Sequence, residues 1–327
     1  PEMATRVYLA LCVCGFCAAL LYLCRARDPS GGSPQLLLAL PLCTGYPFFH
    51  GFLNYLAALP VLTFGAGFLL RNPQGRGVRG VLALVGLPTL AYLCHGTALG
   101  AWGVLLLVQT WVGRSRAFAW RAALGLAPVL GLVLLYIAQR SAEGAAITWS
   151  AGSVWATVLY RIRSPLRFFS VFQGLTPTFD DPSLVWIAPL LVSLNALYAL
   201  GLGLASVRWA LRARSSTDAG ERFLALSVLA LTAAFVLLPH DAAKMLNPAE
   251  RLLIPLACFG VAGMSGRSRS RQPLMRWGLF LLLGAQALYT AIYGTRAALI
   301  ARDVAAARER YRAQAVQAPE IGGLTPP

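Results

Sequence analysis

Charged side chains are scarce in this chain of 327 residues. They make up 12% of the sequence, against about 25% in soluble domains, while hydrophobic residues make up 57%. A soluble domain of this length would not have enough polar side chains to cover its surface. The composition therefore predicts a polytopic membrane protein. A large soluble helical domain is disfavoured, because apolar runs of spanning length recur along the chain.

Acidic residues and lysine are the rarest charged groups. The chain has 12 Asp and Glu against 28 basic residues, and Lys244 is its single lysine. A net charge of +16 would suggest nucleic acid if the arginines formed a surface stripe, but they lie in short clusters between apolar runs, as in cytoplasmic loops. The expected partner is therefore a lipid bilayer, with no nucleic acid. An Arg-rich, Lys-poor composition is typical of GC-rich genomes and favours a bacterial inner membrane.

The apolar runs predict helices, since the chain has no ten-residue stretch in which polar and apolar residues alternate. Seven cysteines lie in or at the ends of these runs. Cys12, Cys14 and Cys17 would point in three directions on a helix, so they predict small core residues rather than a metal site. No cofactor is predicted. A divalent cation stays open, although the His, Asp and Glu residues show no firm metal-binding spacing.

The predicted fold is all-α, a transmembrane bundle of about ten spanning or partly spanning helices over residues 1–300. The run 80–112 is long enough for two short helices, and we expect a break at 94–97 because a hairpin places its two basic flanks on one side. The tail 301–327 is charged and then rich in Pro and Gly, which predicts partial disorder. The predicted spans cover residues 7–24, 35–49, 51–70, the two halves of 80–112, 122–139, 184–207, 223–238, 252–266 and 277–300.

The arginine clusters indicate which connectors face the cytoplasm. Five connectors, each with two to four arginines, are predicted to be cytoplasmic: 25–33, 71–79, 113–121, 207–222 and 267–276. The segment 140–183 is then a long external loop, in which apolar residues at helical spacing predict an interfacial helix around 152–170.

This topology places the three histidines at outer helix ends, on the same side of the membrane as the polar stretch 239–251, which contains His240. His240, Asp241 and Glu250 are candidates for acid–base chemistry, because partial burial can tune such groups toward neutral pH; a solvated loop is the alternative.

Five further residues are candidates for substrate binding: Arg251, Lys244, His50, Asn54 and His95. Arg251 can clamp a phosphate, pair with Glu250 or extend toward the interface. His50 and Asn54 are four residues apart and therefore share a helix face, where a packed polar contact is the alternative. His95 can equally be a turn residue.

The chain shows no glycine loop for phosphate, no nucleophile elbow and no nucleotide-binding domain. Gly65, Gly67, Gly201 and Gly203 fall inside apolar runs, where small residues predict close helix packing.

Three segments resemble the C-type (GT-C) glycosyltransferase superfamily of multi-pass membrane enzymes. They are Gly-Phe-Leu-Asn-Tyr at 51–55, Ala-Tyr-Leu-Cys-His at 91–95 and Asn-Pro-Ala-Glu-Arg-Leu-Leu-Ile-Pro at 247–255. The resemblance implies transfer of a sugar from a polyprenyl-phosphate carrier at the outer face of the membrane. It places the main catalytic carboxylate in a loop upstream of Pro1, and it matches Arg251, and less closely Lys244, to the lipid-linked phosphate. The acceptor stays open.

Two other classes compete with this interpretation. A transporter or flippase would be expected to carry charges in the middle of its spans or a repeated pair of broken helices, and the sequence shows neither. A non-catalytic membrane protein is the third alternative.

Overall fold

The computed structural model describes thirteen parts of the chain: residues 2–29, 36–39, 41–42, 53–142, 147–148, 158–164, 188–238, 241–242, 245–246, 248–265, 284, 287 and 302–310. The chain divides into two compact units, Pro1–Leu279 and Phe280–Pro327. In the second unit, residues 302–310 form a helix. All labelled helices and strands belong to the first unit.

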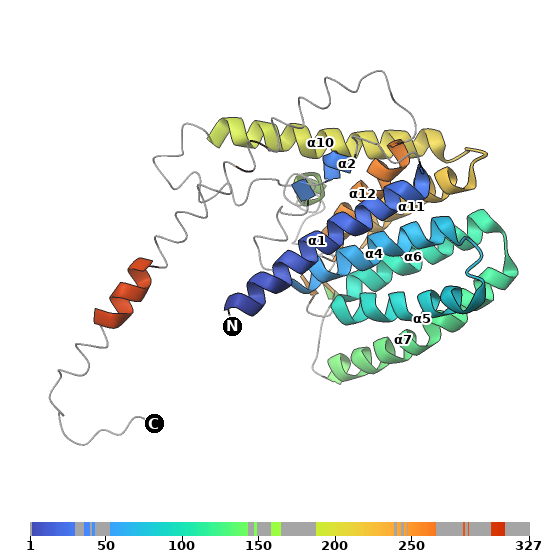
Figure 1. Ribbon diagram of the computed structural model, residues 1–327, viewed down its shortest axis with the longest axis horizontal. Helices are drawn as coiled ribbons and strands as arrows, with labels where there is room; N and C mark the ends of the chain where they lie inside the picture. The colour runs from blue at the N-terminus through green and yellow to red at the C-terminus, as the bar shows by residue number, and fades with distance from the viewer. Residues whose placement is uncertain are drawn as a thin grey trace. The chain divides into compact units, whose positions relative to one another are not determined.

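Helices build the first unit (Figure 1). They are α1 (Glu2–Arg27), α2 (Leu36–Ala39), α4 (Leu53–Arg71), α5 (Gly77–Cys94), α6 (Gly96–Gly113), α7 (Arg116–Ala142), α10 (Ala188–Ala213), α11 (Ala219–Leu237), the short 3-10 helix η2 (Glu250–Leu252) and α12 (Leu253–Met264). Residues 158–164 form a further helix. Seven of these helices, α1, α4, α5, α6, α7, α10 and α11, are long and apolar enough to cross a membrane.

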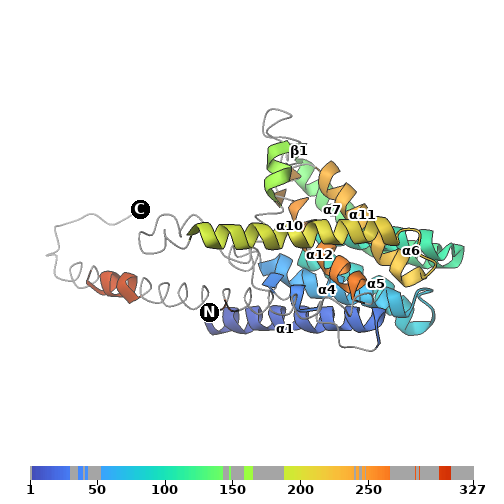
Figure 2. The same ribbon diagram turned by 90° about the horizontal axis from the view of Figure 1, so that it is seen from above.

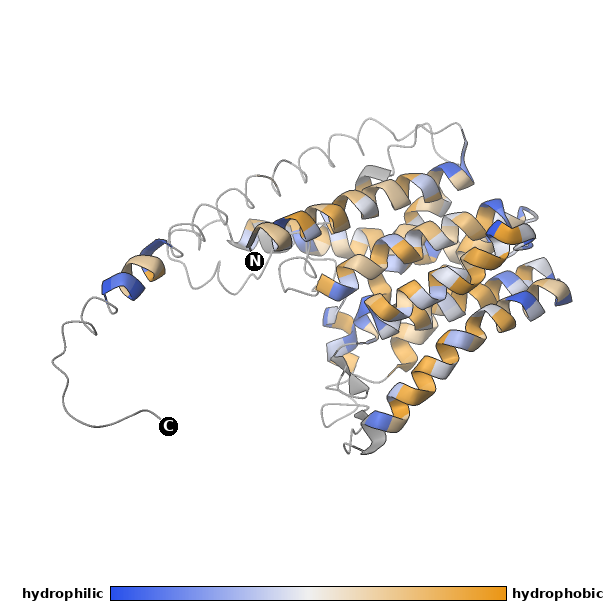
Figure 3. Ribbon diagram, turned by 60° about the horizontal axis from the view of Figure 1, so that its bottom comes forward, coloured by the Kyte–Doolittle hydropathy of each residue, from blue (hydrophilic) through white to orange (hydrophobic). Residues whose placement is uncertain are grey.

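The protein is therefore a multi-pass membrane protein with a helical bundle, as predicted. Hydrophobic residues run along most of the length of the bundle helices, and polar residues gather toward their ends (Figure 3). The seven helices match seven of the ten predicted runs. The runs 35–49 and 277–300 lie largely outside the described residues, and the run 252–266 forms α12, which has only 12 residues. The total of ten spans stays a prediction.

The predicted break at 94–97 is present. His95 has an extended backbone, with φ −167° and ψ 130°, and it separates α5 from α6. Its N–H donates to the carbonyl of Ala91 (2.8 Å), while its Nδ1 accepts from the N–H of Thr97 (3.2 Å). One residue thus ends the first helix and caps the second.

Polar contacts show which helix ends lie together. The Tyr8 hydroxyl donates to the carbonyl of Leu53 (3.1 Å), so α1 and α4 start at the same end, and both run away from it. Arg27 at the end of α1 pairs with Asp218 before α11 at 2.8 Å. We call the end of the bundle where α1 ends the Arg27 end. The opposite end, where α1 and α4 start and α5 is followed by α6, is the His95 end.

Four arginine-rich connectors meet at the Arg27 end. The Arg27–Asp218 pair joins the connector after α1 to the one before α11. Arg222 donates to the carbonyl of Val112 (3.3 Å) at the end of α6, and Arg121 donates to the carbonyl of Gln74 (2.6 Å) between α4 and α5. The predicted grouping of these connectors is confirmed, whereas the connector 267–276 lies outside the described residues.

A small antiparallel sheet links two connectors at the His95 end. Its strands are β1 (Ile147–Thr148), β2 (Asp241–Ala242) and β3 (Met245–Leu246), in the order β1-β2-β3. Ile147 pairs with Ala242, and Asp241 pairs with Leu246. The long segment after α7 therefore lies beside the polar stretch after α11, at the end where the sequence places both. The helix at 158–164 falls within the predicted interfacial helix, and the rest of 152–170 lies outside the described residues.

The short helix α12 lies at the centre of the bundle. All of its residues from Leu253 to Gly263 are buried, because it is apolar on every face and packs against α1, α4, α10 and α11 (Figure 2). A Cβ atom on Gly260 would overlap Ser206, and one on Gly263 would overlap the ring of Trp209, so α10 approaches α12 closely. This packing fixes η2, which directly precedes α12, at the His95 end.

Candidate functional site

Three side chains from distant segments meet at the His95 end. Arg251, in η2, places its Nη1 atom 3.4 Å from Nδ1 of His95. The ring of Tyr55, in the first turn of α4, lies edge-on to the His95 ring with centroids 5.9 Å apart. The Tyr55 hydroxyl donates to the backbone carbonyl of Arg251, and the guanidinium lies 5.8 Å from the Tyr55 ring centre. Tyr55 and Arg251 are both buried.

His95 is held in its neutral form. Burial, followed by the positive charge of Arg251, lowers the pKa of His95 to about 4. Its Nδ1 atom accepts a hydrogen bond from the N–H of Thr97, so the single proton of the neutral ring sits on Nε2. At pH 7 the ring therefore offers one N–H donor and carries no charge.

Glu250 is the second centre of the site. Its side chain is fully buried, and Oε1 receives bonds from Arg161 Nη1 (3.3 Å) and Ser164 Oγ (3.2 Å), both in the helix at 158–164. Arg161 also donates to the carbonyl of Leu238 and lies over the ring of Phe235, 5.2 Å from its centre. The long connector after α7 thus reaches the residue that precedes Arg251.

The other oxygen of Glu250, Oε2, is buried and has no hydrogen-bond partner within the described part of the chain. A buried carboxylate oxygen is costly to leave unbonded. It is therefore a natural acceptor for a hydroxyl group of a ligand.

The longest helices extend beyond the site. Tyr8 is level with Leu53, the first residue of α4, so α1 extends about 10 Å past that point. The Tyr92 hydroxyl donates to the carbonyl of Leu132 (3.3 Å), and α7 continues for ten more residues, whereas α5 stops at Cys94. At the His95 end, α1 and α7 therefore extend about 10 Å beyond His95 and Arg251 along the bundle axis.

The charges of the site suit an anion. Among the described side chains of the site, the guanidinium groups of Arg161 and Arg251 lie with one carboxylate and one neutral imidazole, so these four groups sum to one positive charge. Arginine presents a fork of donors that matches phosphate oxygens. Across the described residues, no group of three His, Cys, Asp or Glu side chains is able to hold a metal ion.

The structure brings together three of the eight residues proposed from the sequence: His95, Glu250 and Arg251. Asn54 is exposed, on the first turn of α4. Asp241 lies in β2, where the backbone pairing alone is described. His50, His240 and Lys244 lie outside the described residues.

Three residues of the site do not stand out in the sequence. Tyr55 follows the candidate Asn54 but points about 100° away from it around the helix, into the bundle. Arg161 falls within the predicted interfacial helix, where an arginine is expected to contact lipid phosphate and not Glu250. Ser164 carries no signal in the sequence.

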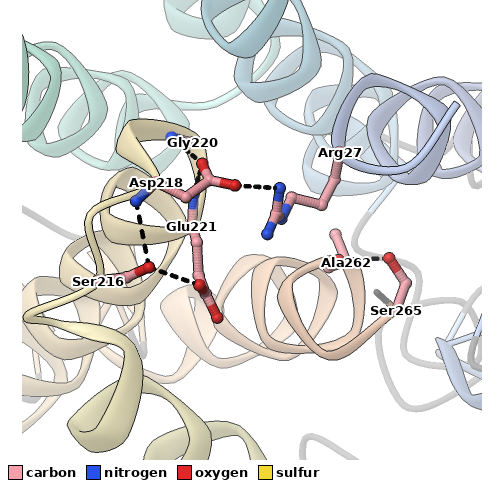
Figure 4. A network of polar contacts seen from close by, with 7 residues as sticks. All are labelled: Arg27, Ser216, Asp218, Gly220, Glu221, Ala262 and Ser265. Carbon is pink, nitrogen blue, oxygen red and sulfur yellow. Dashed lines mark hydrogen bonds and ion pairs between the residues drawn. The ribbon is translucent and has the colours of Figure 1, made fainter. Parts of the chain in front are cut away.

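A second polar network lies at the Arg27 end (Figure 4). Oδ1 of Asp218 accepts from the N–H groups of Gly220 (2.8 Å) and Glu221 (3.0 Å), which makes Asp218 the N-cap of α11. Burial would raise the pKa of Asp218, but the backbone bond from Glu221 and the charge of Arg27 outweigh it and lower the pKa. Ser216 donates to Glu221 Oε2 at 2.6 Å. This network joins α1 to α11 and is structural.

Comparison of the chain with protein-family models, with curated proteins and with solved structures finds no match. Its function is therefore inferred from the His95 end itself.

Proposed function

We propose that the protein is a membrane glycosyltransferase that uses a polyprenyl-phosphate-linked sugar, with the lipid-linked phosphate bound at Arg251. The observation that carries this proposal is the meeting of Tyr55, His95 and the Glu250–Arg251 pair. Each comes from one of the three segments that resemble GT-C glycosyltransferases, and these segments are far apart in the sequence. A shared site gives a physical reason for the three motifs to occur in one chain.

The chemistry of the site fits a phosphate leaving group. In the transfer, the bond between the sugar C1 and the phosphate oxygen breaks, and a bond from C1 to an acceptor oxygen forms. The acceptor proton passes to a carboxylate base, for which Asp241 is a candidate from the sequence. The departing phosphate gains negative charge, which the guanidinium of Arg251 and the Nε2–H of His95 are suited to stabilise.

Glu250 and Arg161 have supporting roles in this proposal. Oε2 of Glu250 accepts a hydrogen bond from a sugar hydroxyl, while Oε1 stays bonded to Arg161 and Ser164. The recessed position of the site keeps the sugar near the membrane surface while the polyprenyl chain stays in lipid. We place the His95 end on the outer face of a bacterial inner membrane, because the arginine-rich connectors gather at the opposite end.

Binding of the donor tests the proposal. Full-length protein in detergent is titrated with a short-chain polyprenyl phosphate that carries a radiolabelled sugar. Arg251→Ala is expected to weaken binding by about 10-fold to 100-fold, the loss typical of one charge-assisted contact. Arg251→Lys keeps the charge and is expected to lose less. Arg163→Ala, an exposed arginine at the same end, is the matched control.

Two results would contradict the proposal, and a third would favour a transporter. Absence of donor binding in the wild-type chain, or equal binding by Arg251→Ala and Arg163→Ala, would contradict the proposal. Binding without release or transfer of the sugar would instead favour a transporter of the same lipid. Thermal unfolding of each variant shows whether a lost signal reflects a lost fold.

A further inference from the structure

Two connectors at the Arg27 end form a basic surface without any acidic residue. They span residues 71–79 and 113–121 and contain six arginines: Arg71, Arg76, Arg79, Arg114, Arg116 and Arg121. Five of the six are exposed, and Arg121 is half-buried. We call this set the six-arginine surface. It is separate from the site at the His95 end.

Two hydrogen bonds hold the connector 71–79 against the end of α6 and the start of α7. Arg121 donates to the carbonyl of Gln74 (2.6 Å), and the Gln109 amide donates to the carbonyl of Pro73 (3.0 Å). Within the described part of the chain, none of the six arginines forms an ion pair with a carboxylate. Arg27 nearby differs, because Asp218 neutralises it. The surface therefore concentrates positive charge that the described protein residues leave unbalanced.

Exposed tryptophans place this surface at the level of lipid headgroups. Trp111 is 77% exposed near the end of α6, and Trp120 is 70% exposed near the start of α7. Indole rings on membrane-facing helices gather at the headgroup region. Trp120 lies four residues after Arg116 on the same helix face, and Trp111 lies three residues before Arg114. The arginines are thus at the depth where lipid phosphates lie.

We propose that the six-arginine surface, flanked by Trp111 and Trp120, binds anionic phospholipid headgroups in preference to zwitterionic ones. A zwitterionic headgroup brings a cation as well as a phosphate, so it cannot offset the repulsion among six guanidinium groups. An anionic headgroup offsets it, and each arginine near the surface contributes about fivefold to the binding constant. The indole rings favour a membrane lipid over a soluble phosphate, because they lie at the headgroup level of a bilayer.

Tryptophan quenching by brominated lipids tests this proposal. Full-length protein is placed in phosphatidylcholine vesicles that contain either brominated phosphatidylglycerol or brominated phosphatidylcholine at equal mole fraction. The same measurement on Trp111→Phe/Trp120→Phe isolates the signal of these two residues from that of the other six tryptophans. The brominated anionic lipid is expected to quench them several-fold more strongly. Equal quenching by the two lipids would overturn the proposal.

A matched pair of variants tests the arginines. Arg116→Gln is expected to reduce the preference for the anionic lipid by about fivefold. Arg163→Gln removes the same charge from an exposed helical position at the His95 end and is expected to leave the preference unchanged. An equal effect of both variants, or no effect of Arg116→Gln, would overturn the proposal. Melting temperatures confirm that both variants are folded. The described contacts of Arg251 and Glu250 involve neither Arg116 nor Arg163, so the result is independent of the sugar-transfer proposal.

Discussion

Arg251 and His95 are separated by 156 positions in the chain, yet the guanidinium of Arg251 lies 3.4 Å from Nδ1 of His95. Burial of the imidazole, followed by the nearby charge of Arg251, lowers the pKa of His95 and keeps the ring neutral. Tyr55 joins the pair through its hydroxyl bond to the Arg251 carbonyl. The start of α4, the break between α5 and α6, and η2 are thus coupled through buried polar contacts.

Acidification is expected to destabilise the protein through His95. The pKa of His95 is about 4 in the folded chain and about 6.5 in an unfolded chain, so between these values the unfolded chain binds more protons. The contribution of His95 to the free energy of unfolding is complete above pH 6.5 and is lost as the pH falls toward 4. The loss is at most about 3 kcal/mol. Melting temperatures of the detergent-solubilised protein between pH 7.5 and about 4.5 measure it.

His95→Asn is the matched variant for this prediction. The asparagine oxygen takes the place of Nδ1 and accepts from the N–H of Thr97, but it does not titrate. The variant is therefore expected to lose less stability on acidification than the wild-type protein. Parallel pH curves for the two proteins would show that His95 does not control this loss.

Arg161 and Glu250 are expected to be energetically coupled. Glu250→Gln leaves Arg161 charged and half-buried without its ion-pair partner, at a cost on the order of 3 kcal/mol. Arg161→Met leaves the buried carboxylate of Glu250 unpaired and is expected to cost a similar amount. The double variant is expected to be more stable than the sum of the two losses predicts, by about 1–3 kcal/mol. Unfolding free energies from a double-mutant cycle measure the coupling, and additive losses would contradict it.

Charge and local composition predict much of this fold. The break at His95 and the gathering of arginine-rich connectors at one end follow from the positive-inside pattern, because membrane insertion reads that pattern directly. Gly65 and Gly67 lie at close helix contacts, against Trp102 and Tyr22, as small residues in an apolar run predict. Gly201 has the same local sequence signal, yet a Cβ atom added there would meet nothing within 4 Å, so it lies at no such contact among the described residues.

There is a physical reason why the sequence predicts only part of the site. Arg251, Glu250 and His95 stand out because polar groups are rare near apolar runs. The contacts of Arg251 with Tyr55 and of Glu250 with Arg161 depend on how distant helices pack, and no local periodicity encodes that packing. Sequence patterns therefore identify polar residues at helix ends but not their partners.

Gly65→Ala is expected to destabilise the bundle. A Cβ atom at Gly65 would overlap the ring of Trp102, which is fully buried and has no room to move. The expected loss is about 1–3 kcal/mol. Gly86→Ala, at an exposed position of α5 with nothing within 4 Å, is the control and is expected to be neutral or to stabilise the helix slightly. Thermal unfolding of both variants checks the difference, and equal melting temperatures would contradict the close contact.

The orientation of the bundle decides where the site can act. Since the arginine-rich connectors lie at the Arg27 end, we expect this end in the cytoplasm and the His95 end outside. Single cysteines introduced at Arg76 and Arg163, both exposed and at opposite ends, test this in a variant that lacks the seven native cysteines. In intact cells an impermeant maleimide is expected to label Arg163→Cys at once and Arg76→Cys only after lysis.

The reverse labelling pattern would place Arg251 and Glu250 at the cytoplasmic surface. A lipid-linked donor at the outer face would then be out of reach of Arg251, so the sugar-transfer proposal would fail. The lipid preference of the six-arginine surface would survive, because it depends on the charge of the lipid and not on the leaflet. The two proposals are therefore separable by one labelling experiment and one quenching experiment.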